Sequence, residues 1–334
     1  MGTILLALLL SLGATLADDG QEVVSVTEEV SVAAVQIMGY DKVGRVKEGL
    51  DPVSVLLPYI EQAGYEGVDL LVFPEYHLGR IKVPGPETDR IGEAIRQQSI
   101  YVIVGSWELL DHGEYANAAL LFGRDGHILG KYYKTHAAVD HYDKDHTPWT
   151  TPTSGHDLEW FIKHDPEWKM ERGRQLPVFT LDFGKIGILT CYDGWFPEPW
   201  RVLSLRGAEI VVWINGRGGT VKDHIVRSAM FWNEVHVVTV NQAYGAGTMI
   251  GQYPRTILQQ VQQPGEAYIR AELDLGSLRH ARARSRNLAQ RRPDLYGTLT
   301  EAPVPPNSIR HMSCSEAVED FRASSGRTRL HDLP

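Results

Sequence analysis

Short apolar runs alternate with amphipathic stretches along most of this chain. Runs rich in Val, Ile and Leu that stop at Gly, Pro or Asp are typical of buried strands, whereas apolar positions three or four residues apart are typical of helices. We therefore expect strands or hairpins at 29–37, 68–75, 101–109, 117–134, 177–190, 210–215 and 237–243. Helices are expected at 53–67, 88–100, 197–209 and 222–236, and Pro58 makes the middle of the first one doubtful.

This order of elements predicts an α/β protein in which helices cover a mixed sheet. Strands that follow helices favour parallel pairing, and the hairpins at 117–134 and 177–190 add antiparallel pairs. Residues 140–176 are polar, aromatic and rich in turn residues, which predicts a long functional loop rather than a packed element.

The two ends of the chain differ from its middle. Residues 1–17 contain an apolar core from Ile4 to Leu10 followed by small residues, which predicts a signal peptide cut after Ala17 and a secreted or periplasmic protein. A buried N-terminal element or a lipid-facing anchor is the open alternative, and the run is short for a membrane span. From Ala302 onward the pattern is lost, so we expect a C-terminal extension at 301–334.

The composition is that of a soluble globular protein, with 43% hydrophobic and 22% charged residues. The net charge of −9 and the lack of a dominant basic stripe argue against a nucleic-acid partner. One arginine-rich stretch, residues 279–293, is interpreted as a basic surface or a subunit-contact segment, with a nucleic-acid patch as the alternative.

Only two cysteines occur in 334 residues. Cys191 follows the apolar run 185–190 and precedes a turn, whereas Cys314 lies in a polar tail, so we expect a free Cys191 rather than a disulfide. A thiol is a good nucleophile only when ionised, and a strand, a turn and a helix N-terminus near Pro197 would help to expose and charge it. A small buried core residue is the alternative role of such a cysteine.

Two more chemically useful residues follow predicted strands. Glu75 comes after the run "LLVFP", and Lys134 ends "ILGKYYK". A carboxylate in partly apolar surroundings has a raised pKa and can act as a general base, and an ammonium can stabilise a thiolate or an oxyanion. One sheet edge could therefore bring Glu75, Lys134 and Cys191 together.

These pieces resemble the nitrilase superfamily of carbon–nitrogen hydrolases, whose catalytic set is Glu, Lys and Cys. The chain has "AAVQI", "LLVFPE", "GKYYKTH" and "GKIGILTCYD" in the family's order, followed by "GAEIVVWING" and "VVTVNQA". The resemblance covers about residues 30 to 300 and implies a carbon–nitrogen hydrolase domain at 29–300. It also implies a four-layer αββα sandwich, and pairing into a homodimer or larger homo-oligomer through the helix after the cysteine.

The resemblance also implies roles for individual residues. Glu75 would act as the base, Cys191 as the nucleophile, and Lys134 with the backbone N–H of Tyr192 as the oxyanion site, with no metal or cofactor. The family's second glutamate is matched by Glu167, with Glu171 as the alternate, because the usual Pro-Gly is replaced here by Arg172-Gly173.

The substrate implied is a small-molecule amide or N-carbamoyl compound, because "CYD" stands where true nitrilases have "CWE". Nitrile hydrolysis by the same residues is the alternative. Asn215 and Arg217 follow the next predicted strand and are expected to line the pocket, although a loop turn and a surface arginine explain them equally well.

Three other functions are open at this point. His136, His141 and His146 recur every five residues among aspartates and could bind a metal, although that spacing does not align ligands on one helix face. A thiol protease would use His224 or His236 beside Cys191. A catalytically silent secreted binding protein would have kept the fold without turnover.

Overall fold

The computed structural model describes residues 28–40, 49–138 and 163–300 of the chain. The predicted signal peptide, the predicted C-terminal extension and Cys314 lie outside the described residues, and so do His141 and His146. In the described part of the chain, no helix combines the length and the apolar character that crossing a membrane requires.

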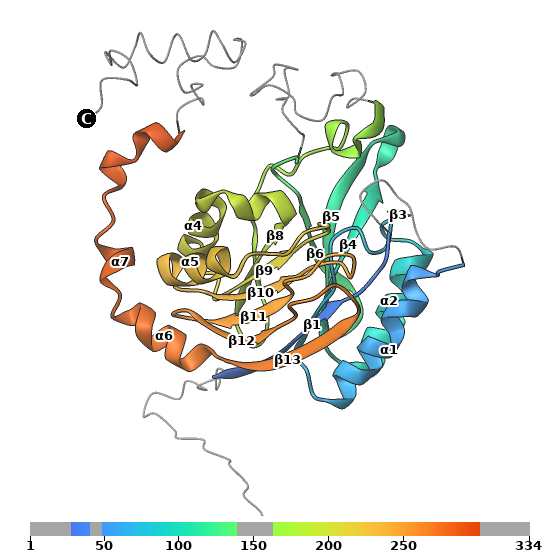
Figure 1. The fold of residues 1–334 in the computed structure, drawn as a ribbon, viewed down its shortest axis with the longest axis horizontal. Helices are drawn as coiled ribbons and strands as arrows, with labels where there is room; N and C mark the ends of the chain where they lie inside the picture. The colour runs from blue at the N-terminus through green and yellow to red at the C-terminus, as the bar shows by residue number, and fades with distance from the viewer. Residues whose placement is uncertain (1–27, 41–48, 139–162, 301–334) are drawn as a thin grey trace, which may run out of the picture.

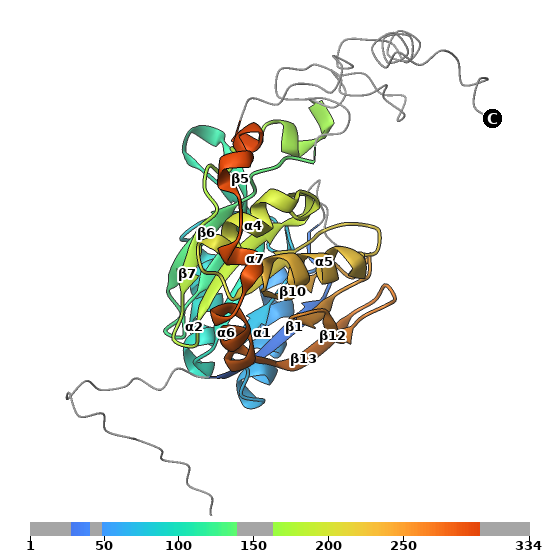
Figure 2. The same ribbon diagram turned by 90° about the vertical axis from the view of Figure 1, so that its left-hand side faces the viewer.

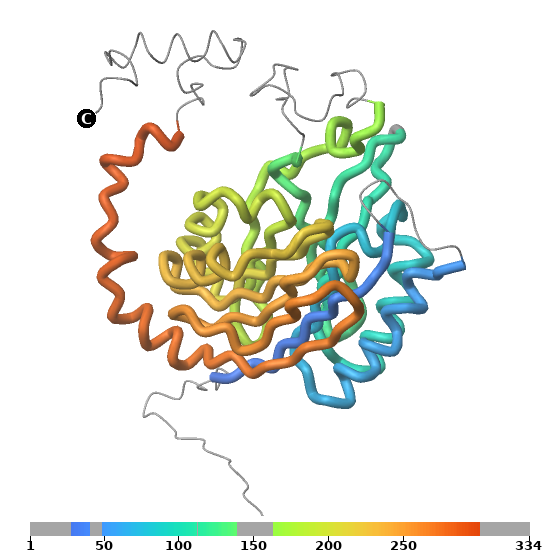
Figure 3. The backbone as a smooth tube through the Cα atoms, in the orientation of Figure 1, coloured from blue at the N-terminus to red at the C-terminus, as the bar shows by residue number. Residues whose placement is uncertain are grey.

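The first sheet is formed mainly by the N-terminal half of the chain. Its order is β13-β1-β2-β4-β5-β6, and β3 pairs with β4. The strands are β1 (Glu29–Gln36), β2 (Leu70–Val72), β3 (Arg80–Lys82), β4 (Tyr101–Leu109), β5 (Tyr115–Phe122), β6 (Ile128–Tyr133) and β13 (Ala267–Asp274). The strands β1, β2 and β4 are parallel, and β1 also pairs antiparallel with β13, so the first and last strands lie side by side (Figure 3).

The second sheet is formed by the C-terminal half and has the order β12-β11-β10-β9-β8-β7. The strands are β7 (Val178–Thr180), β8 (Lys185–Thr190), β9 (Ile210–Ile214), β10 (His236–Val240), β11 (Met249–Gln252) and β12 (Thr256–Gln260). The central strands β8, β9 and β10 are parallel. Their carboxyl ends therefore meet at one edge of the sheet, where ligands commonly bind in such folds.

Helices cover the outer face of each sheet (Figure 1). The helices α1 (Pro52–Tyr65) and α2 (Pro86–Gln98) pack on the first sheet, and α4 (Pro197–Leu205) and α5 (Asp223–Asn233) pack on the second. A third apolar cluster lies between the sheets, with Val32, Val72 and Ile103 from one sheet and Ile188 and Val212 from the other. Three apolar layers therefore separate four structural layers, which is the predicted αββα sandwich.

The chain after β13 forms α6 (Leu275–Ala283), α7 (Arg286–Ala289), η4 (Pro293–Leu295) and η5 (Gly297–Thr300). This segment runs along the outer side of α4 and α5 (Figures 1 and 2). Arg282 joins it to the body by donating hydrogen bonds to the backbone oxygens of Ala208 and Glu234.

The predicted hairpins form as β5–β6 and β7–β8. The helix α1 continues through Pro58, because its buried face of Val53, Leu56, Ile60 and Ala63 packs against the sheet and outweighs the missing backbone donor. Asp51 caps its first turn by accepting a hydrogen bond from Val53 N at 3.1 Å.

Candidate active site

The predicted site residues follow strands of both sheets. Glu75 lies three residues after β2, Lys134 directly after β6, Cys191 directly after β8 and Asn215 directly after β9. Because the two sheets face each other across a shared core, these strand ends can converge although the residues are far apart in sequence. The side chain of Lys134 is in direct contact with those of Glu75 and Glu167.

Glu75 is fully buried. Its Oε1 accepts hydrogen bonds from Asn117 Nδ2 at 2.7 Å and from Lys134 Nζ at 3.1 Å, whereas Oε2 is buried without a partner. Gly105 on β4 makes room for this residue, because a Cβ at position 105 would lie 2.6 Å from Glu75 Cα. Burial raises the pKa of Glu75, and the charge of Lys134 opposes part of that rise. Glu75 therefore presents one free oxygen with an affinity for a proton.

Lys134 is fully buried between two carboxylates. Its Nζ lies 2.7 Å from Glu167 Oε1 as well as 3.1 Å from Glu75 Oε1. Burial lowers the pKa of Lys134, but Glu167 and Glu75 raise it by more, so that the pKa lies well above its usual value. Lys134 is therefore a fixed ammonium, which matches an electrostatic role rather than proton transfer.

Glu167, and not Glu171, holds Lys134 from its other side. Glu167 is fully buried and also accepts hydrogen bonds from Tyr76 OH at 2.7 Å and from Ala138 N. Glu171 is partly exposed and pairs with Arg174 instead. The geometry thus separates two glutamates between which the sequence left a choice.

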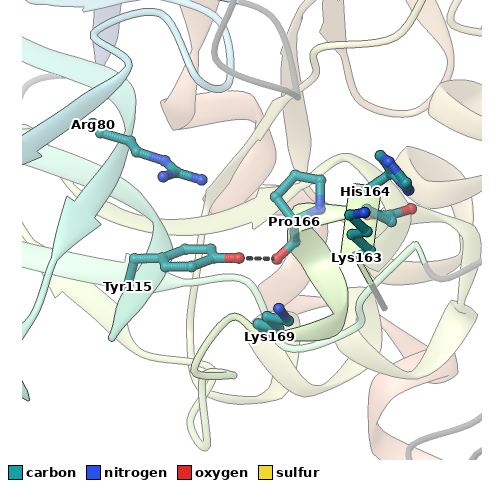
Figure 4. Close-up of a pocket in the computed structure, with 7 residues that line it drawn as sticks. Arg80, Tyr115, Lys163, His164, Pro166 and Lys169 are labelled. Atoms are coloured by element: carbon teal, nitrogen blue, oxygen red, sulfur yellow. Dashed lines mark hydrogen bonds between the residues drawn. The ribbon is translucent and has the colours of Figure 1, made fainter. Parts of the chain in front are cut away.

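The turn that carries Glu167 is packed rather than loose. Residues Pro166–Trp168 form η2, and Asp165 caps it by accepting a hydrogen bond from Glu167 N at 2.9 Å. Tyr115 on β5 donates a hydrogen bond to Pro166 O at 2.6 Å (Figure 4). The predicted loop 140–176 therefore ends in a packed turn, and its residues 139–162 lie outside the described part of the chain.

A cavity of about 280 Å³ lies beside this turn and differs in character from the Glu75 site. Three cationic side chains, Arg80, Lys163 and Lys169, line it (Figure 4). The rest of the lining consists of Tyr115, His164, Asp165 and Pro166. None of the residues predicted for catalysis lines it.

Cys191 begins the tight turn η3 (Cys191–Trp195) with a φ of +46°. A left-handed conformation at a non-glycine residue costs about 1 kcal/mol or more, and such strain is typical of functional sites. Trp213 holds the turn by donating a hydrogen bond from Nε1 to Cys191 O at 2.8 Å. Burial and the negative charge of Glu75 raise the pKa of Cys191 to about 12, although Lys134 lowers it. The thiol is therefore protonated at rest.

The helix after Cys191 offers less stabilisation of a thiolate than the sequence predicted. The helix α4 begins only at Pro197, after η3, and both Pro197 and Pro199 lack an N–H in its first turn. Among the neighbouring charges, Glu75 raises the pKa of Cys191 and Lys134 lowers it.

Asp193 supports the candidate site, and the sequence analysis did not single it out. Its side chain is buried and accepts hydrogen bonds from Thr190 N at 3.0 Å, Tyr132 OH at 2.7 Å and His136 N at 2.8 Å. Asp193 thus ties the Cys191 turn to the segment that carries Lys134. The third letter of "CYD" was the available signal, and it served there only as an indication of the substrate.

The other predicted residues have different environments. Tyr192 is partly exposed, and its ring packs edge-on against Phe196. Asn215 is buried and donates to Trp213 O at 2.9 Å and to Thr239 Oγ1 at 3.2 Å, so its amide group braces the end of β9. Arg217 lies with its guanidinium 5.0 Å above the ring of Trp195.

The histidines that the sequence analysis considered for a metal site or a thiol protease have other contacts. His136 Nδ1 lies 3.0 Å from Asp193 Oδ1, and the described residues contain no group of three or more His, Cys, Asp or Glu side chains that could hold a metal ion. His236 is committed to backbone groups, because Nδ1 accepts from Tyr253 N at 3.0 Å and Nε2 contacts Asp274 O at 3.1 Å. His224 lines a hollow between α4 and α5.

A family model described as carbon-nitrogen hydrolase matches residues 31–283. The chain belongs to the carbon–nitrogen hydrolase family. It is thus an enzyme of C–N bond hydrolysis, and its fold is shared with solved members of the nitrilase superfamily. The carbon-nitrogen hydrolase from Helicobacter pylori superposes with a TM-score of 0.64 at 18% identity, over 82% of this chain and 99% of that one. Nit3 of Saccharomyces cerevisiae gives 0.63 at 19%, over 80% and 98%.

Two curated relatives carry names that state an activity. The human omega-amidase NIT2 is 26% identical over 244 residues, which are 69% of this chain and 81% of that protein. A formamidase from Bacillus thuringiensis is 28% identical over 231 residues, which are 61% of this chain and 62% of the relative.

Proposed function

We propose that this enzyme hydrolyses small amides or N-carbamoyl compounds through a thioester on Cys191. The observation that carries the proposal is the unpartnered, buried Oε2 of Glu75 beside the ammonium of Lys134. A base with a free oxygen next to a protonated thiol is what nucleophilic catalysis by cysteine requires. The names of the two relatives, omega-amidase and formamidase, support an amide as the substrate.

The first half of the reaction forms the acyl-enzyme. Glu75 takes the proton of Cys191 as sulfur attacks the carbonyl carbon, and Lys134 with the backbone N–H of Tyr192 stabilises the negative charge on oxygen. The C–N bond then breaks, and Glu75 returns the proton to the departing nitrogen. Ammonia or an amine leaves, and a thioester remains on Cys191.

The second half regenerates the enzyme. Glu75 takes a proton from water as the water oxygen attacks the thioester carbon. The C–S bond then breaks, the carboxylic acid leaves, and the proton returns to the sulfur. Glu167 and Asn117 keep Lys134 and Glu75 in place through both halves, because they occupy hydrogen-bonding groups that would otherwise rearrange.

Ammonia release from a defined set of compounds tests this proposal. The set holds formamide, butyramide, succinamate, N-carbamoylglycine and butyronitrile. We expect ammonia from at least one amide or carbamoyl compound, no turnover after treatment with iodoacetamide, and no effect of EDTA. Turnover of the nitrile only would establish the alternative substrate class, and loss of activity with EDTA would overturn the thiol mechanism.

We further propose that two copies pair through the α4–α5 face. Trp195 and Trp232 are 50% and 55% exposed there, beside a hollow of about 250 Å³, and exposed aromatic side chains are enriched at subunit interfaces. Light scattering is expected to give a dimer for the native chain and a monomer for Trp232→Glu. Tyr65→Glu on α1, where the tyrosine is 92% exposed, should stay dimeric. A native monomer contradicts the pairing.

A further inference from the structure

Arg217 occupies a distinctive position next to the catalytic cluster. It follows Gly216, and a Cβ added at Gly216 would lie 3.2 Å from Glu75 Oε2 and 2.6 Å from the Tyr76 ring. The backbone before Arg217 therefore packs directly against the free oxygen of the proposed base. Trp195, over which the Arg217 guanidinium lies, ends the same turn that Cys191 begins. Arg217 thus bridges the Glu75 and Cys191 sides of the site.

The Arg217 side chain is held in place but not neutralised. Its backbone N donates to Asn241 Oδ1 at 3.0 Å, its backbone O accepts from Asn241 Nδ2 at 3.1 Å, and Trp195 stacks on the guanidinium. Its Nη1 is buried without a hydrogen-bond partner, and in the described part of the chain no ion pair involves Arg217. An unpaired buried donor is costly, so such a group calls for an acceptor that arrives from outside.

The positive charge of Arg217 also acts on the thiol of Cys191. It lowers the pKa of Cys191, together with Lys134 and against the effects of burial and of Glu75. Lys134 already has two carboxylate partners, whereas Arg217 has none among the described residues. Of these two cations, Arg217 is therefore the one without a carboxylate partner and can receive the carboxylate of a substrate.

We propose that Arg217 binds a carboxylate carried by the substrate at the end remote from the amide. Resting on the proposed amidase function, this inference names the substrate class as monoamides of dicarboxylic acids. A carboxylate matches the planar guanidinium fork and forms charge-assisted hydrogen bonds with it. Glu75 and Glu167 would repel an anionic substrate from the rest of the site, so the anion needs this cation as a fixed receptor.

The test compares two amides of equal chain length that differ in charge. Succinamate ends in a carboxylate, whereas butyramide ends in a methyl group. We expect the native enzyme to prefer succinamate in kcat/KM, and Arg217→Met to lose about 10- to 100-fold more on succinamate than on butyramide, mainly through KM, because any effect of Arg217 on Cys191 is shared by both substrates. Arg217→Lys keeps the charge without the fork and should recover part of the loss.

Arg80→Met is the matched control. Arg80 also stacks on an aromatic ring, Tyr115 at 5.1 Å, and has no ion pair among the described residues, but it lines the separate cavity of Figure 4. The ratio of the two kcat/KM values should not change in this variant. A second measurement avoids turnover altogether. Calorimetry with Cys191→Ala should detect succinamate binding that the added Arg217→Met change abolishes.

The outcomes separate this inference from the proposed function. Equal kcat/KM for both amides in the native enzyme, or equal losses on both in Arg217→Met, would overturn the role of Arg217 and leave the amidase function standing. Absence of turnover on every amide and carbamoyl compound would overturn the proposed function. In that case, succinamate binding that depends on Arg217 would still support carboxylate recognition by Arg217. A lack of succinamate binding would overturn carboxylate recognition as well.

Discussion

Cys191→Ala is expected to lower kcat on an accepted amide by about 10⁴-fold or more, because removal of a covalent nucleophile leaves only binding and electrostatic effects. The free energy of unfolding should change by less than about 1 kcal/mol, since alanine keeps the Cβ that already lies at a φ of +46°. Ammonia release and urea unfolding of the same preparation measure both quantities.

Cys314→Ala is the matched control, because it removes the other cysteine of the chain. It should retain normal turnover, and iodoacetamide should still inactivate it with the label on Cys191, as peptide mass spectrometry can locate. Normal turnover in Cys191→Ala, or inactivation that tracks a label on Cys314, would contradict a thioester mechanism at Cys191.

The sequence predicted the parallel central strands of both sheets better than the strands in the last part of the chain. The runs 70–73 and 210–214 are continuously apolar because β2 and β9 are covered on both faces, and that pattern is visible without any structure. The strands β3, β11, β12 and β13 were not assigned. β12, at the edge of its sheet, has no fully buried residue, so no strong periodicity marks it.

The positions of Glu75, Lys134 and Cys191 were predictable because each of them follows an apolar strand. Their supporting contacts were not, since they join positions far apart in the sequence. Tyr132 and Asp193 are separated by 61 residues, and Tyr76 and Glu167 by 91. The protonation state of the Cys191 thiol could not be predicted from the sequence either. The pKa of Cys191 results from a balance between burial, Glu75 and Lys134 that depends on their packing.

Glu75→Gln separates two effects of one carboxylate. The negative charge of Glu75 raises the pKa of Cys191, so its removal should lower that pKa and increase the thiolate fraction at neutral pH. If Glu75 acted only through its charge, the variant would be more active than the native enzyme. As the proton acceptor, it cannot be replaced by an amide, and we expect kcat/KM to fall by about 10²- to 10⁴-fold.

The pH dependence of iodoacetamide labelling at Cys191 measures the first effect, and ammonia release measures the second. In Glu75→Gln the labelling profile should shift to lower pH than in the native enzyme, where the pKa lies at about 12. Glu108→Gln is the matched control, since Glu108 is a nearly buried glutamate that pairs with Lys131 at 2.6 Å in the same sheet. It should change neither the labelling profile nor turnover. Because a purely electrostatic Glu75 requires both quantities to rise together, easier labelling with lost turnover would identify it as the base.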